Sequence, residues 1–338
     1  MGAKNLAQGL RVLVVGYGSI GSRHLRNLLS SGHLVRPSVV EPRKDMAERA
    51  QREYAVKVYE SLNSALSDGQ DAVLVCTPPV SHVDIAIEAA RSGAHVFVEK
   101  PLSDRLDGVQ ELIREVETRH LVGMTAFNFR FHPHLRLVKS LLDEGAIGSV
   151  YCLRSESGSY LPGWHPTEDY RMEYSARRDL GGGIILDAIH EIDMARWLLG
   201  EVREVCCYWD KISDLEIETE DLAAILLRFA NRSIGEIHLD YVQRSYSRNC
   251  KLIGEAGTIT WDITQSQVGI FSAFKGEWQT HKMAVETNDM YVAELKHFLD
   301  CILHGLKPEV TLRDGERALA IALAAKTSGV EKRTIILE

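Results

Sequence analysis

Residues 10–21 read Leu-Arg-Val-Leu-Val-Val-Gly-Tyr-Gly-Ser-Ile-Gly, a short apolar run followed at once by a glycine motif. The run has the length and β-branched content of a buried strand, and leucines at helical spacing behind the motif predict a helix that ends near Gly32. Strand, G-x-G-x-x-G and helix therefore follow in the order that a phosphate-binding turn requires. Gly16 permits the tight turn, Gly18 lets the backbone approach a ligand, and Gly21 lets the helix pack against the strand.

The next expected strand, residues 38–40, ends in Glu41, 20 residues after Gly21. An acid at this position accepts hydrogen bonds from ribose hydroxyls and disfavours a ribose phosphate, so the sequence favours NAD over NADP as the cofactor. Arg43 and Lys44 follow closely and could serve such a phosphate instead, which leaves NADP open.

Residues 93–101, Gly-Ala-His-Val-Phe-Val-Glu-Lys-Pro, contain a second informative strand. Proline cannot donate to a sheet ladder and restricts the residue before it, so the strand is expected to stop at about Lys100. Another expected strand, 71–76, ends similarly at Cys76-Thr77-Pro78-Pro79 and precedes a helix over 82–91. Because ligands bind outside the carboxyl ends of parallel strands, Lys100 is placed where a ligand would lie.

Strands and helices alternate from residue 10 to residue 127, which predicts an α/β fold with a doubly wound parallel sheet. In this region Ser103 is expected to cap a helix that runs to about Val116. The expected first domain is therefore 1–127, an NAD(P)-binding domain.

Beyond a helix at 134–142 the pattern changes to alternating apolar and polar runs. The expected strands are 149–157, 202–212, 222–230, 234–243, 248–254 and 258–263. They predict a second domain, 128–338, of the α+β class with a large, mostly antiparallel sheet and one embedded helix at 187–199. Two helices, 290–304 and 314–328, and a strand at 334–337 are expected to close the chain.

The composition excludes several classes of function. The chain has 338 residues and a formal net charge of −8, which disfavours a nucleic-acid partner. No apolar run approaches the roughly 18 residues of a membrane helix, and the start, Met-Gly-Ala-Lys-Asn-Leu, lacks a secretory apolar segment. The six cysteines are scattered without C-x-x-C spacing, so we expect reduced thiols, a cytoplasmic protein and no metal site.

A second group of chemical residues follows three glycines, Gly181-Gly182-Gly183. On one continuous helix Asp187, His190 and Glu191 would share a face. A lone buried histidine is more often a core residue, but an acid–histidine face in a chain with a dinucleotide turn favours catalysis.

Together, these motifs resemble those of the glucose–fructose oxidoreductase, inositol dehydrogenase and rhizopine catabolism family, from about residue 10 to the C-terminus. The resemblance implies an N-terminal Rossmann domain and a C-terminal open-faced sheet used in homodimer or homotetramer contacts. It also implies NAD(P)-dependent oxidation or reduction of a sugar or polyol.

Carried over by position, Lys100 and Pro101 fall on the family's lysine–proline pair, with Lys100 at the substrate hydroxyl and the nicotinamide. Asp187 falls on the family's aspartate, and His190 takes the role of its catalytic histidine. The family usually places histidine four residues after the aspartate, whereas the interval here is three and Glu191 is the fourth. Whether His190 or Glu191 faces the substrate is therefore open, because one helical residue turns a side chain by about 100°.

The chemistry agrees with this assignment. Oxidising an alcohol needs a hydride acceptor, a proton acceptor and a group that stabilises the developing alkoxide. Histidine titrates near neutrality and suits the proton acceptor, so we assign that role to His190, held by Asp187, with Lys100 donating to the oxygen. A Lys100–His190 relay is the alternative. The expected cofactor contacts are Gly16, Gly18, Ser19, Ile20, Gly21, Glu41, Arg43, Cys76, Thr77, Pro78, His82, Glu99, Lys100, Pro101 and Asn128.

Residues 157–180 are the expected specificity segment, because aromatic faces pack against sugar rings and arginines bind carboxylate or phosphate. The expected substrate contacts are Lys100, Arg130, Tyr160, Trp164, Tyr170, Arg171, Asp187, His190 and Glu191. Solvated arginines in an aromatic lid would give the same pattern. If the arginines bind substrate, the substrate is an anionic or nucleotide-linked sugar. Two rival functions share the fold: a glycosidase that acts by transient oxidation on bound NAD, and a non-catalytic dinucleotide or sugar sensor.

Overall fold

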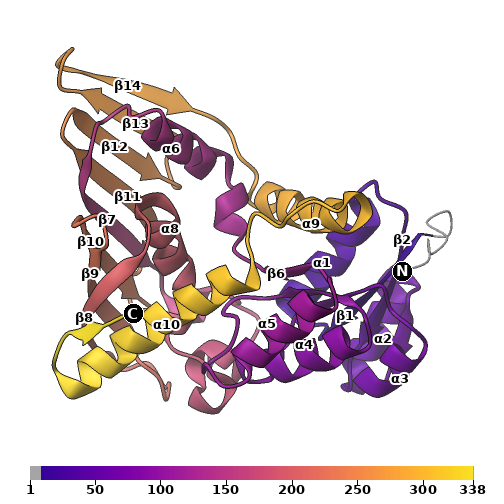
Figure 1. Cartoon of the computed structure of the whole chain (residues 1–338). Helices are drawn as coiled ribbons and strands as arrows, with labels where there is room; N and C mark the ends of the chain where they lie inside the picture. Colours follow the sequence, from indigo (N-terminus) through magenta and orange to yellow (C-terminus); the bar gives the residue numbers. More distant parts are fainter. Residues whose placement is uncertain (1–8, 338) are drawn as a thin grey trace. The chain divides into compact units, whose positions relative to one another are not determined.

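The structure is a computed structural model that describes residues 9–337 (Figure 1). The first six residues, on which the expectation of no export segment rests, lie outside the described residues. Residue contacts divide the chain into two compact units. The first comprises the described residues up to Asn128 together with Asn288–Glu316, and the second comprises Phe129–Thr287 together with the described residues from Arg317 onward.

The segment Asn288–Glu316, which the sequence placed in the second domain, thus packs with the first unit. It contains most of helix α9 (Thr287–His304) and the beginning of α10 (Leu312–Glu331). Phe298 of α9 meets Phe97 edge to face, with ring centroids 5.4 Å apart. An apolar contact between residues so distant in sequence has no local signal, which explains the difference from the expected boundary.

The sheet of the first unit is parallel throughout, as predicted, with the strand order β3-β2-β1-β4-β5-β6. Its strands are β1 (Leu10–Val15), β2 (Val35–Val40), β3 (Lys57–Tyr59), β4 (Ala72–Val75), β5 (His95–Val98) and β6 (Gly123–Thr125). The order reverses between β1 and β4, which is the switch point where doubly wound sheets bind ligands.

Five helices follow the strands of this sheet: α1 (Ser19–Ser30), α2 (Lys44–Tyr54), α3 (Leu62–Ser67), α4 (His82–Arg91) and α5 (Val109–Thr118). The expectation that Ser103 caps the last of them is wrong. α5 begins at Val109 behind Gly108, whose φ of +78° interrupts any helix that starts earlier.

The second unit holds a nine-stranded, mostly antiparallel sheet, as predicted, in the order β14-β13-β12-β11-β7-β10-β9-β8-β15 (Figure 1). Its strands are β7 (Val150–Gly158), β8 (Val202–Asp210), β9 (Leu222–Phe229), β10 (Ile234–Asp240), β11 (Ser247–Gly254), β12 (Gly257–Asp262), β13 (Gln267–Ser272), β14 (Glu277–Lys282) and β15 (Ile335–Ile336). The pair β7–β10 is parallel. Strands β13 and β14 were not predicted. In β13 two adjacent residues, Val268 and Gly269, are buried, which breaks the alternation, and β14 is largely exposed.

Helices α6 (Pro133–Asp143) and α8 (Ile189–Leu199) cover one face of this sheet (Figure 1). The strands alternate accordingly: Ile225 and Leu227 of β9 are buried while Leu226 between them is exposed. The far end of α10 packs on β8, where the Trp209 indole N–H donates to the Lys326 carbonyl at 2.9 Å. One face of the sheet is therefore core and the other faces outward.

Within residues 9–337, no helix combines the length and the apolar content needed to cross a membrane. Over the same residues no group of three or more His, Cys, Asp or Glu side chains could hold a metal ion. All six cysteines carry free thiols.

Candidate active site

Each glycine of the turn between β1 and α1 meets a different structural requirement. Gly16 has φ of +91°, and a Cβ there would lie 2.8 Å from the Cys76 carbonyl oxygen. A Cβ on Gly21 would lie 2.0 Å from the Gly16 carbonyl oxygen, so helix and turn meet only because residue 21 is glycine. Gly18 has no atom within 4 Å of its Cβ position. The turn thus leaves open space at Gly18, where the backbone can approach a phosphate.

Helix α1 begins at Ser19 in front of that space, and its N-cap, Gly18, offers no side-chain hydrogen bond to the first turn. The first amide groups of a helix lack intrahelical acceptors, and the helix dipole adds partial positive charge there. The motif therefore fits a dinucleotide pyrophosphate on this structure's own geometry.

Glu41 directly follows β2 and is buried. Its carboxylate accepts hydrogen bonds from two neighbouring residues. Its carboxylate accepts from the Tyr17 amide at 2.9 Å, and from the Arg43 amide at 3.0 Å and guanidinium at 2.9 and 3.1 Å. Burial alone would raise the pKa of Glu41, but the hydrogen bonds from Arg43 and Tyr17 lower it below its ordinary value. An ionised carboxylate at this position repels a ribose phosphate, and it also engages the Arg43 guanidinium.

His82 joins the turns that follow β4 and β5. Its Nε2 lies 2.7 Å from the Thr77 carbonyl oxygen and its Nδ1 lies 2.8 Å from the Pro101 carbonyl oxygen. Burial lowers the pKa of His82, and a neutral ring donates to only one of the two oxygens. Burial and then the charge of Glu99 raise the pKa of the Cys76 thiol, so Cys76 stays protonated.

The segment after β5 places a buried carboxylate next to Lys100. Glu99 accepts the Lys100 amide at 3.1 Å through Oε2, and its Oε1 lies 2.6 Å from Nε2 of His24 on α1. Sequence reasoning missed His24, whose only signal is a polar residue directly before Leu25 on the buried side of α1. Asn128, also expected at the cofactor, is buried and its Oδ1 has no hydrogen-bond partner within the described residues.

In the second unit, three glycines lead into Asp187 as the sequence indicated. Gly183 has φ of +111°, and a Cβ there would lie 2.4 Å from Oε1 of Glu220. Asp187 ends a short helix α7 (Ile184–Asp187), and Ala188 (φ −90°, ψ 28°) separates it from α8. The expectation that Asp187 and His190 share one continuous helical face is therefore wrong, because Ala188 leaves the helical conformation.

Asp187 is buried and accepts three hydroxyl groups. Tyr174 donates to Oδ1, while Ser175 at 2.7 Å and Tyr241 at 3.0 Å donate to Oδ2. Burial, followed by the charge of Asp187, raises the pKa of Tyr241 well above its ordinary value, so this phenol stays a donor. Sequence reasoning missed Ser175 and Tyr241, because nothing local links residues 175 and 241 to the aspartate.

Glu191 and His190, the two candidates for facing the substrate, have different surroundings. Glu191 is fully buried and forms a two-point ion pair with Arg248, at 2.6 and 2.9 Å. The His190 ring stacks on Phe129 with centroids 4.9 Å apart and planes at 16°. Arg248 also lies over Phe129, with Cζ 4.2 Å from the ring centroid. Because the carboxylate of Glu191 is bound to Arg248, the geometry favours His190 as the residue that faces the substrate.

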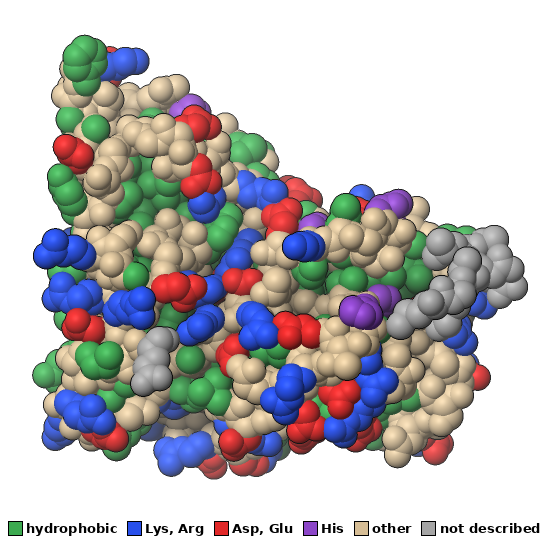
Figure 2. All heavy atoms as spheres, viewed as in Figure 1, with side chains coloured by type: hydrophobic (Ala, Val, Ile, Leu, Met, Phe, Trp, Pro, Cys, Tyr) green, Lys and Arg blue, Asp and Glu red, His purple; other side chains and the backbone are tan. Residues whose placement is uncertain are grey.

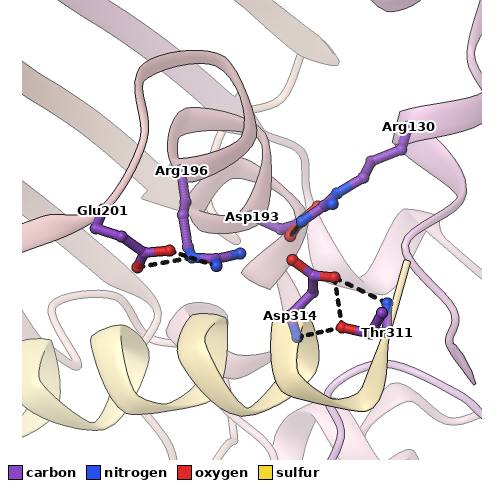
Figure 3. Close-up of polar contacts among 6 residues, drawn as sticks. All are labelled: Arg130, Asp193, Arg196, Glu201, Thr311 and Asp314. Atoms are coloured by element: carbon purple, nitrogen blue, oxygen red, sulfur yellow. Dashed lines mark hydrogen bonds and ion pairs between the residues drawn. The ribbon is translucent and has the colours of Figure 1, made fainter. Parts of the chain in front are cut away.

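Arg130, expected at the substrate, forms a buried ion pair within the second unit (Figure 3). Its Nε and Nη2 donate to Asp193 of α8 at 2.9 and 2.6 Å. Figure 3 also shows Arg196 of α8 bound to Glu201, and Asp314 accepting from Thr311 where α10 begins. These pairs hold α8 and cap α10.

The expected specificity segment consists of short 3-10 turns, and the structure pairs its arginines with nearby acceptors. The pairs are Arg171 with Asp169 and Glu216, Arg177 with Asp179, and Arg178 with the Glu218 carbonyl oxygen.

The aromatic residues expected at the substrate are held in the same unit. The Tyr170 hydroxyl accepts the Glu216 amide at 3.2 Å, and Arg244 lies 3.6 Å from the Tyr160 ring centroid. The Trp164 ring meets Tyr241 edge to face at 5.4 Å, which brings this aromatic residue to a side chain that donates to Asp187.

Comparison with known proteins gives two family matches. Residues 10–127 match the oxidoreductase family model with an NAD-binding Rossmann fold, and residues 135–260 match the GFO/IDH/MocA C-terminal domain. The myo-inositol 2-dehydrogenase of Thermotoga maritima is 32% identical over 97% of this chain and 99% of its own length. The scyllo-inositol 2-dehydrogenase (NAD(+)) of Bacillus subtilis is 29% identical over 94% of each chain. A solved levoglucosan dehydrogenase in complex with NADH, 22% identical, has a TM-score of 0.90 over 98% of this chain and 100% of that chain, a likeness of fold.

Proposed function

Because the chain belongs to the GFO/IDH/MocA oxidoreductase family, we propose that it is an NAD-dependent dehydrogenase of a sugar or polyol. It transfers a hydride between the nicotinamide and a hydroxyl-bearing carbon of the substrate. The observation that carries this proposal is the Glu99–Lys100 segment at the carboxyl end of β5, in the parallel sheet that also carries the glycine turn. Two of the relatives that span nearly the whole chain are inositol dehydrogenases.

Bound NAD supplies the hydride acceptor, and side chains of this protein supply the rest. In our assignment Lys100 donates a hydrogen bond to the reacting oxygen and stabilises its developing negative charge. His190 accepts the hydroxyl proton, and Asp187 supports it; a Lys100–His190 relay is the alternative path for that proton. The commitment of Glu191 to Arg248 supports His190 over Glu191.

We favour a neutral substrate over an anionic or nucleotide-linked one. Binding a carboxylate or phosphate in a fork needs arginine donors, and those of the specificity segment are bound to other groups in the fold. Acceptors are present instead: one oxygen of Glu173, beside Tyr174, is buried without a hydrogen-bond partner among the described residues. Burial raises the pKa of Glu173. Carboxylates of this kind suit the hydroxyl groups of a polyol.

The test is a screen of inositols, free sugars, uronates and nucleotide sugars with NAD and with NADP, followed at the nicotinamide absorbance band. We expect net NADH formation with neutral polyols or sugars. Cleavage of a glycoside without net NADH would contradict the proposal and indicate the glycosidase. Cofactor and sugar binding without turnover of any substrate would indicate a sensor.

Replacing Glu41 by Gln should change the cofactor preference. The substitution removes the negative charge that repels a ribose phosphate, so the ratio of NADPH to NADH affinity should rise by roughly 10-fold, a change of about 1.4 kcal/mol. Fluorescence titration with both reduced cofactors measures this ratio. Glu60→Gln, the same change at an exposed site after β3, is the control and should leave it unchanged. An unchanged ratio in Glu41→Gln would exclude Glu41 as the selecting residue.

We propose that the outward face of the nine-stranded sheet forms a homodimer or homotetramer interface. Register places Tyr208, Leu226, Ile234 and Trp278 on this face, and Tyr208 and Leu226 are 78% and 52% exposed. Figure 2 shows hydrophobic side chains also at the end of the sheet near β13 and β14. Exposed apolar positions along a sheet of this size are typical of an interaction surface.

A charged side chain introduced on the outward face of the nine-stranded sheet should dissociate the proposed homodimer or homotetramer. We expect Leu226→Arg to lower the mass measured by light scattering after gel filtration, because it replaces an exposed apolar side chain by a cation that a contact between copies would have to bury. Leu306→Arg, which changes a leucine of the first unit that is 50% exposed, should leave the mass unchanged. A wild-type chain that runs as a monomer would refute the interface.

We further propose a cytoplasmic protein without a nucleic-acid or membrane partner. All six cysteines are free, which is typical of a reducing compartment, and the formal charge of −8 disfavours phosphate backbones. Fractionation of cells that express the tagged chain would test the location.

A further inference from the structure

We propose that His24 of α1 is a positioning residue that orients Lys100 through the carboxylate of Glu99. This inference rests on the proposed function, because it concerns the lysine that donates to the reacting oxygen. It assigns a role to a residue outside the glycine turn and the Glu-Lys-Pro segment.

The contact is short and fully enclosed. Nε2 of His24 lies 2.6 Å from Oε1 of Glu99, His24 is fully buried and Glu99 is 6% exposed. The other oxygen of Glu99 accepts the Lys100 amide at 3.1 Å. One carboxylate therefore connects the histidine ring to the backbone from which the lysine side chain branches. A turn of the carboxylate would remove a hydrogen bond from that backbone.

The ring's surroundings determine which nitrogen carries the proton. Nδ1 of His24 is buried and has no hydrogen-bond partner among the described residues, so a proton there would be a buried, unsatisfied donor. A proton on Nε2 is donated to Glu99 instead, which is the favourable arrangement. Edge-to-face contacts with Phe97 at 5.3 Å and Tyr291 at 6.3 Å hold the ring plane. His24 is thus a fixed donor aimed at one oxygen.

The same helix carries the phosphate-binding turn. Helix α1 begins at Ser19, directly behind Gly18, and His24 lies between one and two turns further along. Seating of a pyrophosphate at the start of α1 and placement of Lys100 after β5 therefore depend on one rigid element. This gives a physical reason for a histidine on the buried face of α1, beside Leu25 and Leu28.

The experiment compares His24→Leu with His24→Gln. Leucine fills the site but removes the donor, so kcat should fall by roughly 10- to 100-fold, as expected for a catalytic group displaced by about 1 Å. KM and the NADH dissociation constant should stay within about 3-fold. Glutamine can place an amide N–H near the position of Nε2 and should restore kcat to within about 3-fold of wild type. In a Lys100→Met background, His24→Leu should have no further effect, because residues that act as one unit are not additive.

His33 provides a matched control. Its Nε2 lies 2.9 Å from Oδ1 of Asp300, a second histidine–carboxylate pair of the same unit that does not involve β5. His33→Leu should leave kcat unchanged even if it lowers the melting temperature. If His24→Leu does not fold, His24→Asn takes its place, because its shorter amide withdraws the donor from Glu99.

Unchanged kcat in His24→Leu would overturn the inference. So would a His24→Leu substitution that lowers kcat by the same factor in the Lys100→Met background as in wild type. Crystal structures of the Leu and Gln variants give a readout without activity: Lys100 should shift in the first and stay in place in the second. Lys100 unmoved in both would refute the positioning role even if no substrate is found. A wild-type chain without activity toward any substrate refutes only the proposed function.

Discussion

Turnover is expected to fall by roughly two to four orders of magnitude when Lys100 is replaced by Met, because the reacting oxygen loses its cationic donor. Methionine keeps the length and apolar body of the side chain and removes the amine. Backbone contacts of the segment, including the Lys100 amide to Glu99, do not need that amine. NADH binding, measured by fluorescence transfer from protein to cofactor, should therefore stay within about 3-fold of wild type.

A second lysine serves as the control that distinguishes the loss of the Lys100 amine from the loss of one positive charge anywhere in the protein. Lys44 is exposed at the beginning of α2, shortly after Glu41, and Lys44→Met removes the same charge. We expect it to leave kcat unchanged. Normal turnover in Lys100→Met would remove Lys100 from the mechanism. A parallel loss of NADH binding would identify it as a cofactor ligand rather than as a donor to the substrate oxygen.

Much of the first sheet could be predicted because its signals are local. The strand at 10–15 is a short apolar run that ends at glycine, and the structure assigns the same bounds. The strand before Pro101 was expected to stop at about Lys100, and β5 ends two residues earlier, at Val98. In the second sheet, strands with one buried face were predicted from their alternating apolar and polar residues. β14 was not, because its exposed residues leave no apolar period to detect.

The site was less predictable, because its contacts join residues far apart in the sequence. His24 and Glu99 are 75 residues apart, and Glu191 and Arg248 are 57 residues apart. A motif gives the kind of side chain and its local element, but not the partner that packing brings to it. The break at Ala188 is a further example: the sequence predicted one helix over 187–199, whereas the structure ends α7 at Asp187 and begins α8 at Ile189.

The pairing of Glu191 with Arg248 leads to the largest stability effect that we expect. Replacing Arg248 by Leu leaves the carboxylate of Glu191, which is 0% exposed, buried without its charged partner. Breaking a buried ion pair from one side destabilises a protein by about 3–5 kcal/mol, because the remaining charge is uncompensated. Chemical denaturation followed by intrinsic fluorescence should show this loss in the free energy of unfolding of the second unit.

Two further variants distinguish a buried charge from lost packing. Arg177→Leu breaks an exposed pair with Asp179 and should have little effect, since exposed ion pairs contribute little. Adding Glu191→Leu to Arg248→Leu removes the orphaned charge and should recover much of the lost stability, because apolar replacement of both partners is often neutral. If the double variant is no more stable than Arg248→Leu, the loss comes from the packing of Arg248 on Phe129. In that case the charge of Arg248 does not commit Glu191 to the fold, and the ion pair no longer favours His190 over Glu191 as the residue that faces the substrate.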